Sequence, residues 1–205
     1  MDFTQWLTLI SVCLLGAMSP GPSLAVVIGC VVNEDRGGGI RAGLAHGAGV
    51  ALYGLLTVTG LALLITQTPA IYTALQVAGA VYLLFLGGRA LYHLTQPTVA
   101  SVEPSTGSSA AWQGFLVAFL NPKLAVFMLA LFSQFLQPGF GVREKAIMVA
   151  TVGITDAVWY CLVAVLLSRA GFRSRLQRSA ATIDGLFGVI LIALAVSVLY
   201  AALGT

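Results

Sequence analysis

The chain has 205 residues, of which 59% are hydrophobic and only 8% are charged. A soluble domain usually carries about 25% charged residues, and a fold of this size cannot hide so much apolar surface from water. The composition therefore excludes a soluble globular domain. It also excludes a disordered chain, because disorder requires low hydrophobicity and high charge. The net charge of +3 is modest, and no basic patch with interleaved aromatic residues indicates nucleic-acid binding. We expect an integral membrane protein.

Six apolar segments are long enough to cross a bilayer, which takes about 20 apolar residues. They are Trp6–Val32, Ala42–Thr66, Ala70–Leu91, Trp112–Leu136, Ala146–Ser168 and Gly185–Leu203. The first segment is too long for the apolar part of a signal peptide, and no Lys or Arg precedes it. We therefore expect it to be a retained transmembrane helix.

The polar stretch 93–111 contains Ser, Thr and Pro and predicts a cytoplasmic linker loop between two halves, 1–92 and 112–205. Each half has three spans, so the halves insert with opposite orientation. Weak internal similarities support a repeat: Ser19-Pro20 and Asn121-Pro122 are 102 residues apart, and Tyr53 and Trp159 are 106 apart. The predicted fold is an all-α integral membrane protein, with six transmembrane helices arranged as two inverted three-helix repeats.

Positive charge is distributed unequally between the two predicted membrane faces. One face receives only Arg143 and Lys145. The other receives seven residues: Arg36, Arg41, Arg89, Arg169, Arg173, Arg175 and Arg178. Because cytoplasmic loops carry the excess of Lys and Arg, the face with seven is predicted to be cytoplasmic, with both termini outside the cytoplasm. The Arg cluster after span five is also suited to anionic lipid headgroups.

The segment Ser19-Pro20-Gly21-Pro22-Ser23 lies in the middle of the first span. Its two prolines remove two amide donors and free the carbonyls of Gly16 and Met18. Unpaired backbone groups cost several kcal/mol each in hydrocarbon. The segment therefore predicts a broken helix that faces protein or a water-filled cavity, although a kink without a ligand is the simpler alternative.

Asn121-Pro122-Lys123 is the counterpart in the fourth span, where Pro122 frees the carbonyl of Ala118. Lys123 lies near mid-depth, where an unpaired ammonium costs at least about 2.5–3.5 kcal/mol. Asp156 lies at a similar depth in the fifth span, so the two residues are natural partners. They form either a static ion pair or a pair that responds to protons or substrate.

Other polar and small residues give weaker signals. Tyr53 and Trp159 are possible site-lining residues, although core packing explains either one. His46 is predicted to lie near the cytoplasmic interface, and two distant histidines make no metal site, so we expect no cofactor. Gly43, with the small residues that follow it at helical spacing, predicts close helix packing in span two.

Broken helices at corresponding positions of two inverted halves indicate the midplane site of a transporter. In such a site the N-termini of half-helices attract carboxylates, and unwound carbonyls accept ammonium groups or cations. A zwitterion such as an amino acid satisfies both demands.

The chain resembles the LysE/RhtB family of bacterial amino-acid exporters over nearly its whole length. The residues that carry the resemblance are Ser19-Pro20-Gly21-Pro22, Gly79-Ala80-Val81-Tyr82-Leu83, Asn121-Pro122-Lys123, Phe132, Phe135, Asp156 and Trp159. The resemblance implies a secondary transporter of the bacterial inner membrane, often a homodimer, that exports amino acids or their derivatives from the cytoplasm. It also implies proton antiport, with protons as the coupling ion.

Two alternatives remain open at this point. An inorganic-ion or metal carrier is possible because distant relatives of the family move such cargo, but no cluster of Asp, Glu, His or Cys lies inside the predicted spans. A membrane enzyme or a non-transporting scaffold is the second alternative. An enzyme needs a nucleophile with a positioned base, which we do not find, and a scaffold has no use for an internal Lys. We therefore expect a transporter and not an enzyme.

Overall fold

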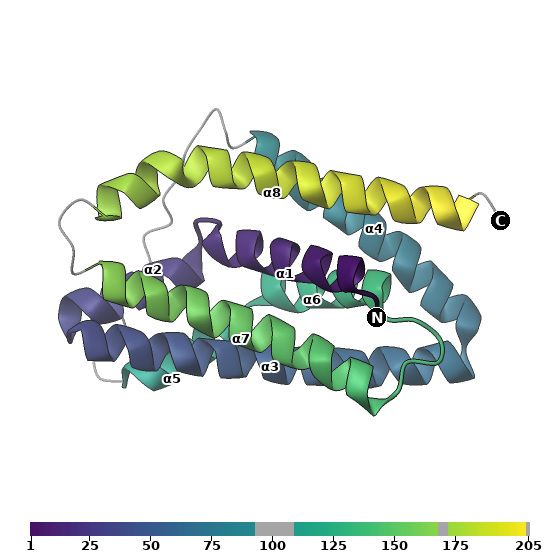
Figure 1. The fold of residues 1–205 in the computed structure, drawn as a ribbon, viewed down its shortest axis with the longest axis horizontal. Helices are drawn as coiled ribbons and strands as arrows, with labels where there is room; N and C mark the ends of the chain where they lie inside the picture. The colour runs from purple at the N-terminus through teal and green to yellow at the C-terminus, as the bar shows by residue number, and fades with distance from the viewer. Residues whose placement is uncertain (93–108, 168–171, 204–205) are drawn as a thin grey trace.

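The computed structural model describes residues 1–92, 109–167 and 172–203 (Figure 1). Within these residues the chain forms helices and no strand, as the sequence predicts. The helices are α1 (Phe3–Met18), α2 (Pro22–Asn33), α3 (Arg36–Gln67), α4 (Pro69–Tyr92), α5 (Ala110–Phe119), α6 (Pro122–Phe135), α7 (Val142–Leu166) and α8 (Phe172–Leu203).

Four of these helices, α3, α4, α7 and α8, each contain a stretch long and apolar enough to cross a membrane. The remaining four form two bent pairs: α1 and α2 meet at 59°, and α5 and α6 meet at 57°. If each bent pair crosses as one broken span, the described residues supply six spans in the predicted order.

Both breaks lie where the sequence predicts them, and the local chemistry explains their form. Pro22 begins α2 and Pro122 begins α6. A proline is tolerated at the first helical position because the N–H that it lacks has no helical partner there. Asn121 caps α6, where its Oδ1 accepts hydrogen bonds from the backbone N–H of Lys123 at 3.0 Å and of Leu124 at 3.3 Å.

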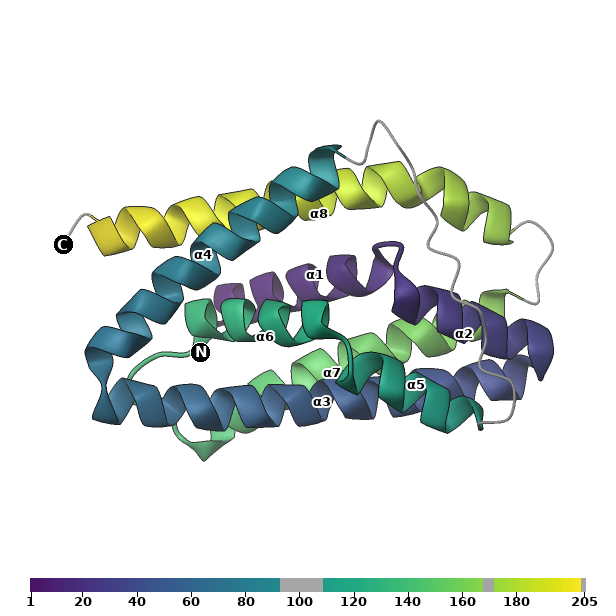
Figure 2. The same cartoon turned by 180° about the vertical axis from the view of Figure 1, so that it is seen from behind.

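The helices lie in three layers (Figures 1 and 2). On one side α4 crosses α8, and on the opposite side α3 packs along α7 and α5. The half-helices α1 and α6 lie between these layers, where α1 contacts α7 and α8 and α6 contacts α4 and α3. The interior of the bundle is therefore built around the two broken spans.

Glycine allows α3 and α7 to approach to backbone contact. A Cβ built on Gly47 would lie 2.6 Å from the Cβ of Ala157 and 2.7 Å from the carbonyl oxygen of Gly153. Reciprocally, a Cβ on Gly153 would lie 2.7 Å from the Cβ of Ala51 and 3.1 Å from the carbonyl oxygen of Gly47. This contact is the close packing that the small residues of span two predict.

The crossing of α4 and α8 is built in the same reciprocal way. A Cβ on Gly87 would lie 2.7 Å from the carbonyl oxygen of Gly188, and a Cβ on Gly188 would lie 2.8 Å from that of Gly87. Each crossing therefore joins one helix from each half of the chain.

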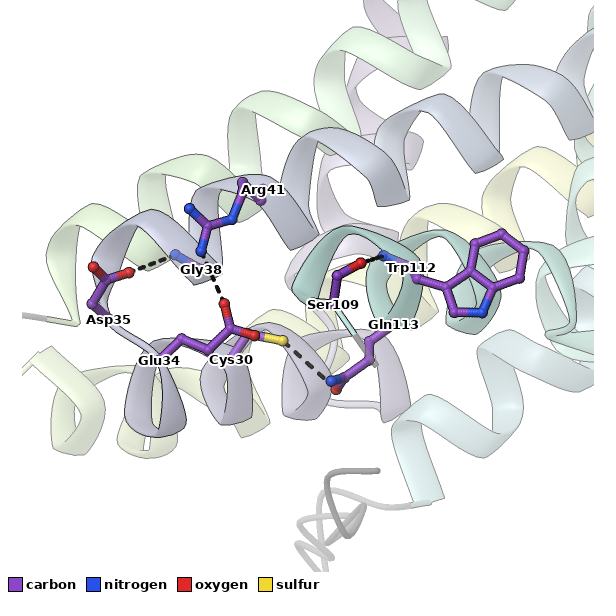
Figure 3. Close-up of polar contacts among 8 residues, drawn as sticks. All are labelled: Cys30, Glu34, Asp35, Gly38, Arg41, Ser109, Trp112 and Gln113. Carbon is purple, nitrogen blue, oxygen red and sulfur yellow. Dashed lines mark hydrogen bonds and ion pairs between the residues drawn. The ribbon is translucent and has the colours of Figure 1, made fainter. Parts of the chain in front are cut away.

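Polar contacts hold the ends of α2, α3 and α5 together (Figure 3). The carboxylate of Asp35 caps α3 by accepting a hydrogen bond from the N–H of Gly38 at 2.7 Å. Arg41 and Glu34 form an ion pair at 2.9 Å. Between α2 and α5, the thiol of Cys30 donates to Gln113 over 3.8 Å. The contact between Cys30 and Gln113 joins α2 and α5, the two half-helices that lead from this end of the molecule to the proline breaks.

Some sequence predictions fall outside the described residues. These are residues 93–108 of the predicted linker 93–111, the end of the fifth span at Ser168, and Arg169. The last part of that linker is helical, since α5 begins at Ala110. The sixth span was predicted to begin too late: α8 begins at Phe172, and the part of α8 that is long and apolar enough to cross a membrane, Arg178–Tyr200, begins before Gly185.

Candidate functional site

Both helix breaks and three ionisable residues lie at the same level of the bundle. One end of the molecule gathers the starts of α3, α5 and α8 and the ends of α2 and α7 (Figure 1). From that end, each of the two breaks is reached after ten to twelve residues of half-helix. His46, Asp156 and Asp184 lie at the same count along α3, α7 and α8. At 1.5 Å per residue this is about 15–18 Å, roughly half the thickness of a bilayer's hydrocarbon core.

A cavity of about 90 Å³ lies at this level, between the two breaks. One water needs about 10–15 Å³ of such space, so the cavity has room for a small solute or several waters. Eight of the predicted site residues line it: Ser19, Pro20, Gly21, Pro22, Ser23, Asn121, Lys123 and Asp156. The structure therefore brings the two proline motifs and the two predicted charges to one cavity.

Ser19 is the C-cap of α1, directly before the first proline. Its hydroxyl donates a hydrogen bond to Oδ1 of Asp184 on α8 at 2.6 Å. Sequence reasoning missed Asp184, because it placed the last span from Gly185 onward and so left Asp184 outside the membrane. Asp184 is therefore a third charged residue that lies well inside a candidate membrane span, in addition to Lys123 and Asp156.

Asp156 pairs with His46 and not with Lys123. The Nδ1 of His46 on α3 lies 2.5 Å from Oδ2 of Asp156 on α7. Both residues are buried, with exposed fractions of 2% and 8%. The prediction that His46 lies at the interface is wrong because α3 begins at Arg36, six residues before the predicted span, and this places His46 deeper.

Lys123 follows Pro122 at the start of α6 and lines the same cavity, although its side chain is exposed in the structure. Lys123 lies at the N-terminus of the half-helix α6, and a helix N-terminus itself carries partial positive charge. The cavity therefore has a cationic side at α6 and the carboxylate of Asp156 on α7, and the carboxylate of Asp184 on α8 lies behind the lining residue Ser19, to which it is bonded.

Tyr53 and Trp159 do not line this cavity. Tyr53 packs against Phe119 with a ring-centroid distance of 5.2 Å, and Trp159 packs with the cluster of buried apolar residues that includes Val27 and Ala164. The aromatic residue that reaches the cavity is Tyr160, whose ring meets the ring of His46 edge-on at 4.8 Å. Sequence reasoning placed the site aromatic one residue too early on α7.

The arrangement suits a small solute with charge at both ends. The N-terminus of α6 and Lys123 offer positive charge to a carboxylate, whereas Asp184 and Asp156 offer negative charge to an ammonium group. Among the described residues, no three His, Cys, Asp or Glu side chains are grouped as metal ligands.

Several known proteins that are similar to this chain are named as amino-acid efflux proteins. A family model described as LysE type translocator matches residues 14–202. A threonine efflux protein of Escherichia coli K12 is 26% identical over 190 residues, which is 90% of this chain and 92% of that protein. A leucine efflux protein of Klebsiella pneumoniae is 29% identical and aligns over 76% of this chain and 74% of its own length. A leucine efflux protein of Salmonella choleraesuis is 31% identical over 75% of this chain and 73% of its own length. No solved structure matches.

Proposed function

The chain belongs to the LysE type translocator family, and from this membership we propose that it exports amino acids or their derivatives from the cytoplasm by proton antiport. As a member of this family it is a transporter and not an enzyme. The observation that carries the proposal is the cavity between the two proline breaks, which has cationic and anionic sides.

In the proposed complex the amino acid lies across this cavity. Its carboxylate binds at the N-terminus of α6 and Lys123, and its ammonium group binds Asp184, to which Ser19 already donates. The relatives that are named for threonine and leucine efflux support small, electrically neutral amino acids as the substrate class.

We further propose that the two halves of the chain are inverted repeats that exchange access to the cavity. The reciprocal crossings support this arrangement, because a two-fold axis requires each contact to occur twice. In the α3–α7 crossing, Gly47 contacts Ala157, and Gly153 contacts Ala51. Gly153 follows Gly47 by 106 residues, and Ala157 follows Ala51 by the same 106 residues, so the two contacts are equivalent under the repeat. Transporters with inverted repeats alternate access by moving one bundle against the other around a fixed site.

The proposed setting is the bacterial inner membrane, with both termini outside the cytoplasm. The unequal distribution of Lys and Arg supports this orientation, and the resemblance to the family supports a homodimer. Anionic lipid is the proposed partner of the Arg cluster at the start of α8.

Flux measurements in proteoliposomes test the proposal. We expect the purified chain to move radiolabelled threonine or leucine when a pH gradient is imposed. Lys123→Ala should reduce this flux, and Lys145→Ala, at the opposite end of the bundle, should not. Normal flux through the Lys123→Ala variant would contradict the residue assignment. Flux of inorganic ions without amino-acid flux would favour the ion-carrier alternative, and no flux from a folded protein would favour a scaffold.

A further inference from the structure

Only one of the two ring nitrogens of His46 has a hydrogen-bond partner among the described residues. Its Nδ1 is bonded to Asp156, whereas its Nε2 is buried and has no hydrogen-bond partner among the described residues. Buried polar atoms nearly always have a partner, and His46 lines the cavity. An unpartnered ring nitrogen at a cavity wall is a binding position for a proton or a donor group.

The partner on Nδ1 determines which nitrogen is basic. A carboxylate accepts hydrogen bonds and cannot donate them, so Nδ1 carries the hydrogen in the neutral ring. The lone pair then lies on Nε2. Binding of one proton at Nε2 produces an imidazolium that Asp156 stabilises, without any change in the bond between the two side chains.

We infer that His46 and Asp156 form the proton-binding site of the antiporter, with Nε2 of His46 as the atom that receives the proton. This inference rests on the proposed function and assigns its coupling step to residues other than Lys123. It gives Asp156 the role of a positioning residue for the imidazole, not of a partner for Lys123.

The charges around His46 make proton binding and amino-acid binding oppose each other. The titratable or charged cavity-lining groups are Asp156 and Tyr160 from α7, Cys13 from α1 and Lys123 from α6; from α8, Asp184 bonds to the lining residue Ser19. The facing residues of α2 and α4 in the cavity, such as Ser23 and Leu86, carry no charge. An added positive charge on His46 therefore weakens the attraction of the cavity for an ammonium group, and a bound ammonium weakens proton binding. Such mutual weakening is the condition for antiport.

The transport cycle then balances without a co-reactant. A proton from the outside binds Nε2 as the amino acid leaves to the outside, and the same proton is released to the cytoplasm as the next amino acid binds there. No bond to carbon forms or breaks, and the net result is one proton in for one amino acid out.

The pH dependence of amino-acid binding tests this inference. We expect the dissociation constants of threonine and leucine for the full-length protein to rise as the pH is lowered, because a proton on Nε2 and a bound ammonium group oppose each other. Coupling between two sites usually amounts to roughly 5–150-fold in affinity, and His46→Asn should remove this pH dependence. In proteoliposomes the same variant should lose substrate-dependent proton flux, while exchange of labelled for unlabelled threonine falls by a smaller factor. His93→Asn, at the other histidine of the chain, should behave as the unsubstituted protein.

Retained pH dependence and retained proton flux in His46→Asn would overturn the inference and leave the proposed function intact. Absence of threonine and leucine flux through the unsubstituted protein would instead overturn the proposed function itself. If His46→Asn does not fold, nitrogen NMR of histidine-labelled, unsubstituted protein decides. We expect the Nε2 signal of His46, identified by comparison with His93→Asn, to change to that of a protonated nitrogen when the pH is lowered. A ring whose Nε2 stays unprotonated while amino-acid binding weakens with falling pH overturns the inference.

Discussion

Asp184 on α8 accepts a hydrogen bond from Ser19 at the end of α1, so the last helix of the chain is tied to the first break. This contact places a carboxylate beside backbone that has left the helix, at the level of the cavity. Carboxylate and unwound backbone together are what an ammonium group needs for binding in a membrane interior.

Asp184→Asn should therefore weaken amino-acid transport. Loss of a hydrogen bond to a charged group costs about 1.5–3 kcal/mol, which corresponds to a fall of roughly tenfold or more in flux at low substrate concentration. The measurement is initial flux of labelled threonine and leucine into proteoliposomes. Glu34→Gln, which alters an exposed ion pair far from the cavity, is the matched control and should retain flux. Equal flux in both variants would remove Asp184 from the site.

Gly114 marks the closest approach of α5 to α3. A Cβ at this position would lie 2.1 Å from the carbonyl oxygen of Ala42, so Gly114→Ala should destabilise the protein by about 1–3 kcal/mol or more. In Gly60→Ala the new Cβ meets nothing within 4 Å, and the higher helix propensity of Ala should leave stability equal or up to about 1 kcal/mol higher. Thermal unfolding followed by tryptophan fluorescence in detergent distinguishes the two. A stable Gly114→Ala variant would contradict the close α3–α5 packing.

The His46–Asp156 pair should show energetic coupling in a double-mutant cycle. His46→Ala and Asp156→Ala each remove one partner and leave the other buried polar side chain unsatisfied, so the double variant should lose less stability than the sum of the single losses. The expected difference is about 0.5–3 kcal/mol, as for residues in direct contact. The exposed pair Glu34 and Arg41 provides a comparison, with an expected coupling of about 0.2–1 kcal/mol. Additive losses at His46 and Asp156 would show that the two side chains do not interact.

The proposed orientation of the chain predicts at which end a fused reporter enzyme is active. Met1 and the end of α8 lie toward the same end of the bundle, opposite the turn between α2 and α3 (Figures 1 and 2). We expect alkaline phosphatase fused after Thr205 to be active, because that enzyme folds only outside the cytoplasm. The same enzyme inserted within residues 93–108 should be inactive. The reverse pattern would invert the proposed topology.

Hydropathy and proline placement were enough to predict the order of the apolar helices and the position of both breaks, although not where the second and sixth spans begin. Proline has the same local effect in any context, since it removes a donor whatever surrounds it. The two motifs at Ser19–Ser23 and Asn121–Lys123 therefore indicated one cavity before any contact was known.

The partners of the charges could not be predicted in the same way. Depth along a span says nothing about the direction in which a side chain points around the helix axis, so Asp156 and Lys123 were matched by depth alone. Asp184 was missed because the polar residues at the start of α8 lower the local hydropathy and conceal how early that span begins. His46 was misplaced for the related reason that α3 starts before its apolar stretch.

The reciprocal glycine crossings have a consequence for assembly of the molecule. Helix α3 packs most extensively against α7, and α4 packs most extensively against α8. Each half of the chain therefore supplies one surface of both crossings. Neither half buries these surfaces by itself. During synthesis, the surfaces of α3 and α4 therefore stay unburied by protein until α7 and α8 have been inserted. The protein completes its folding only when the second half is in the membrane.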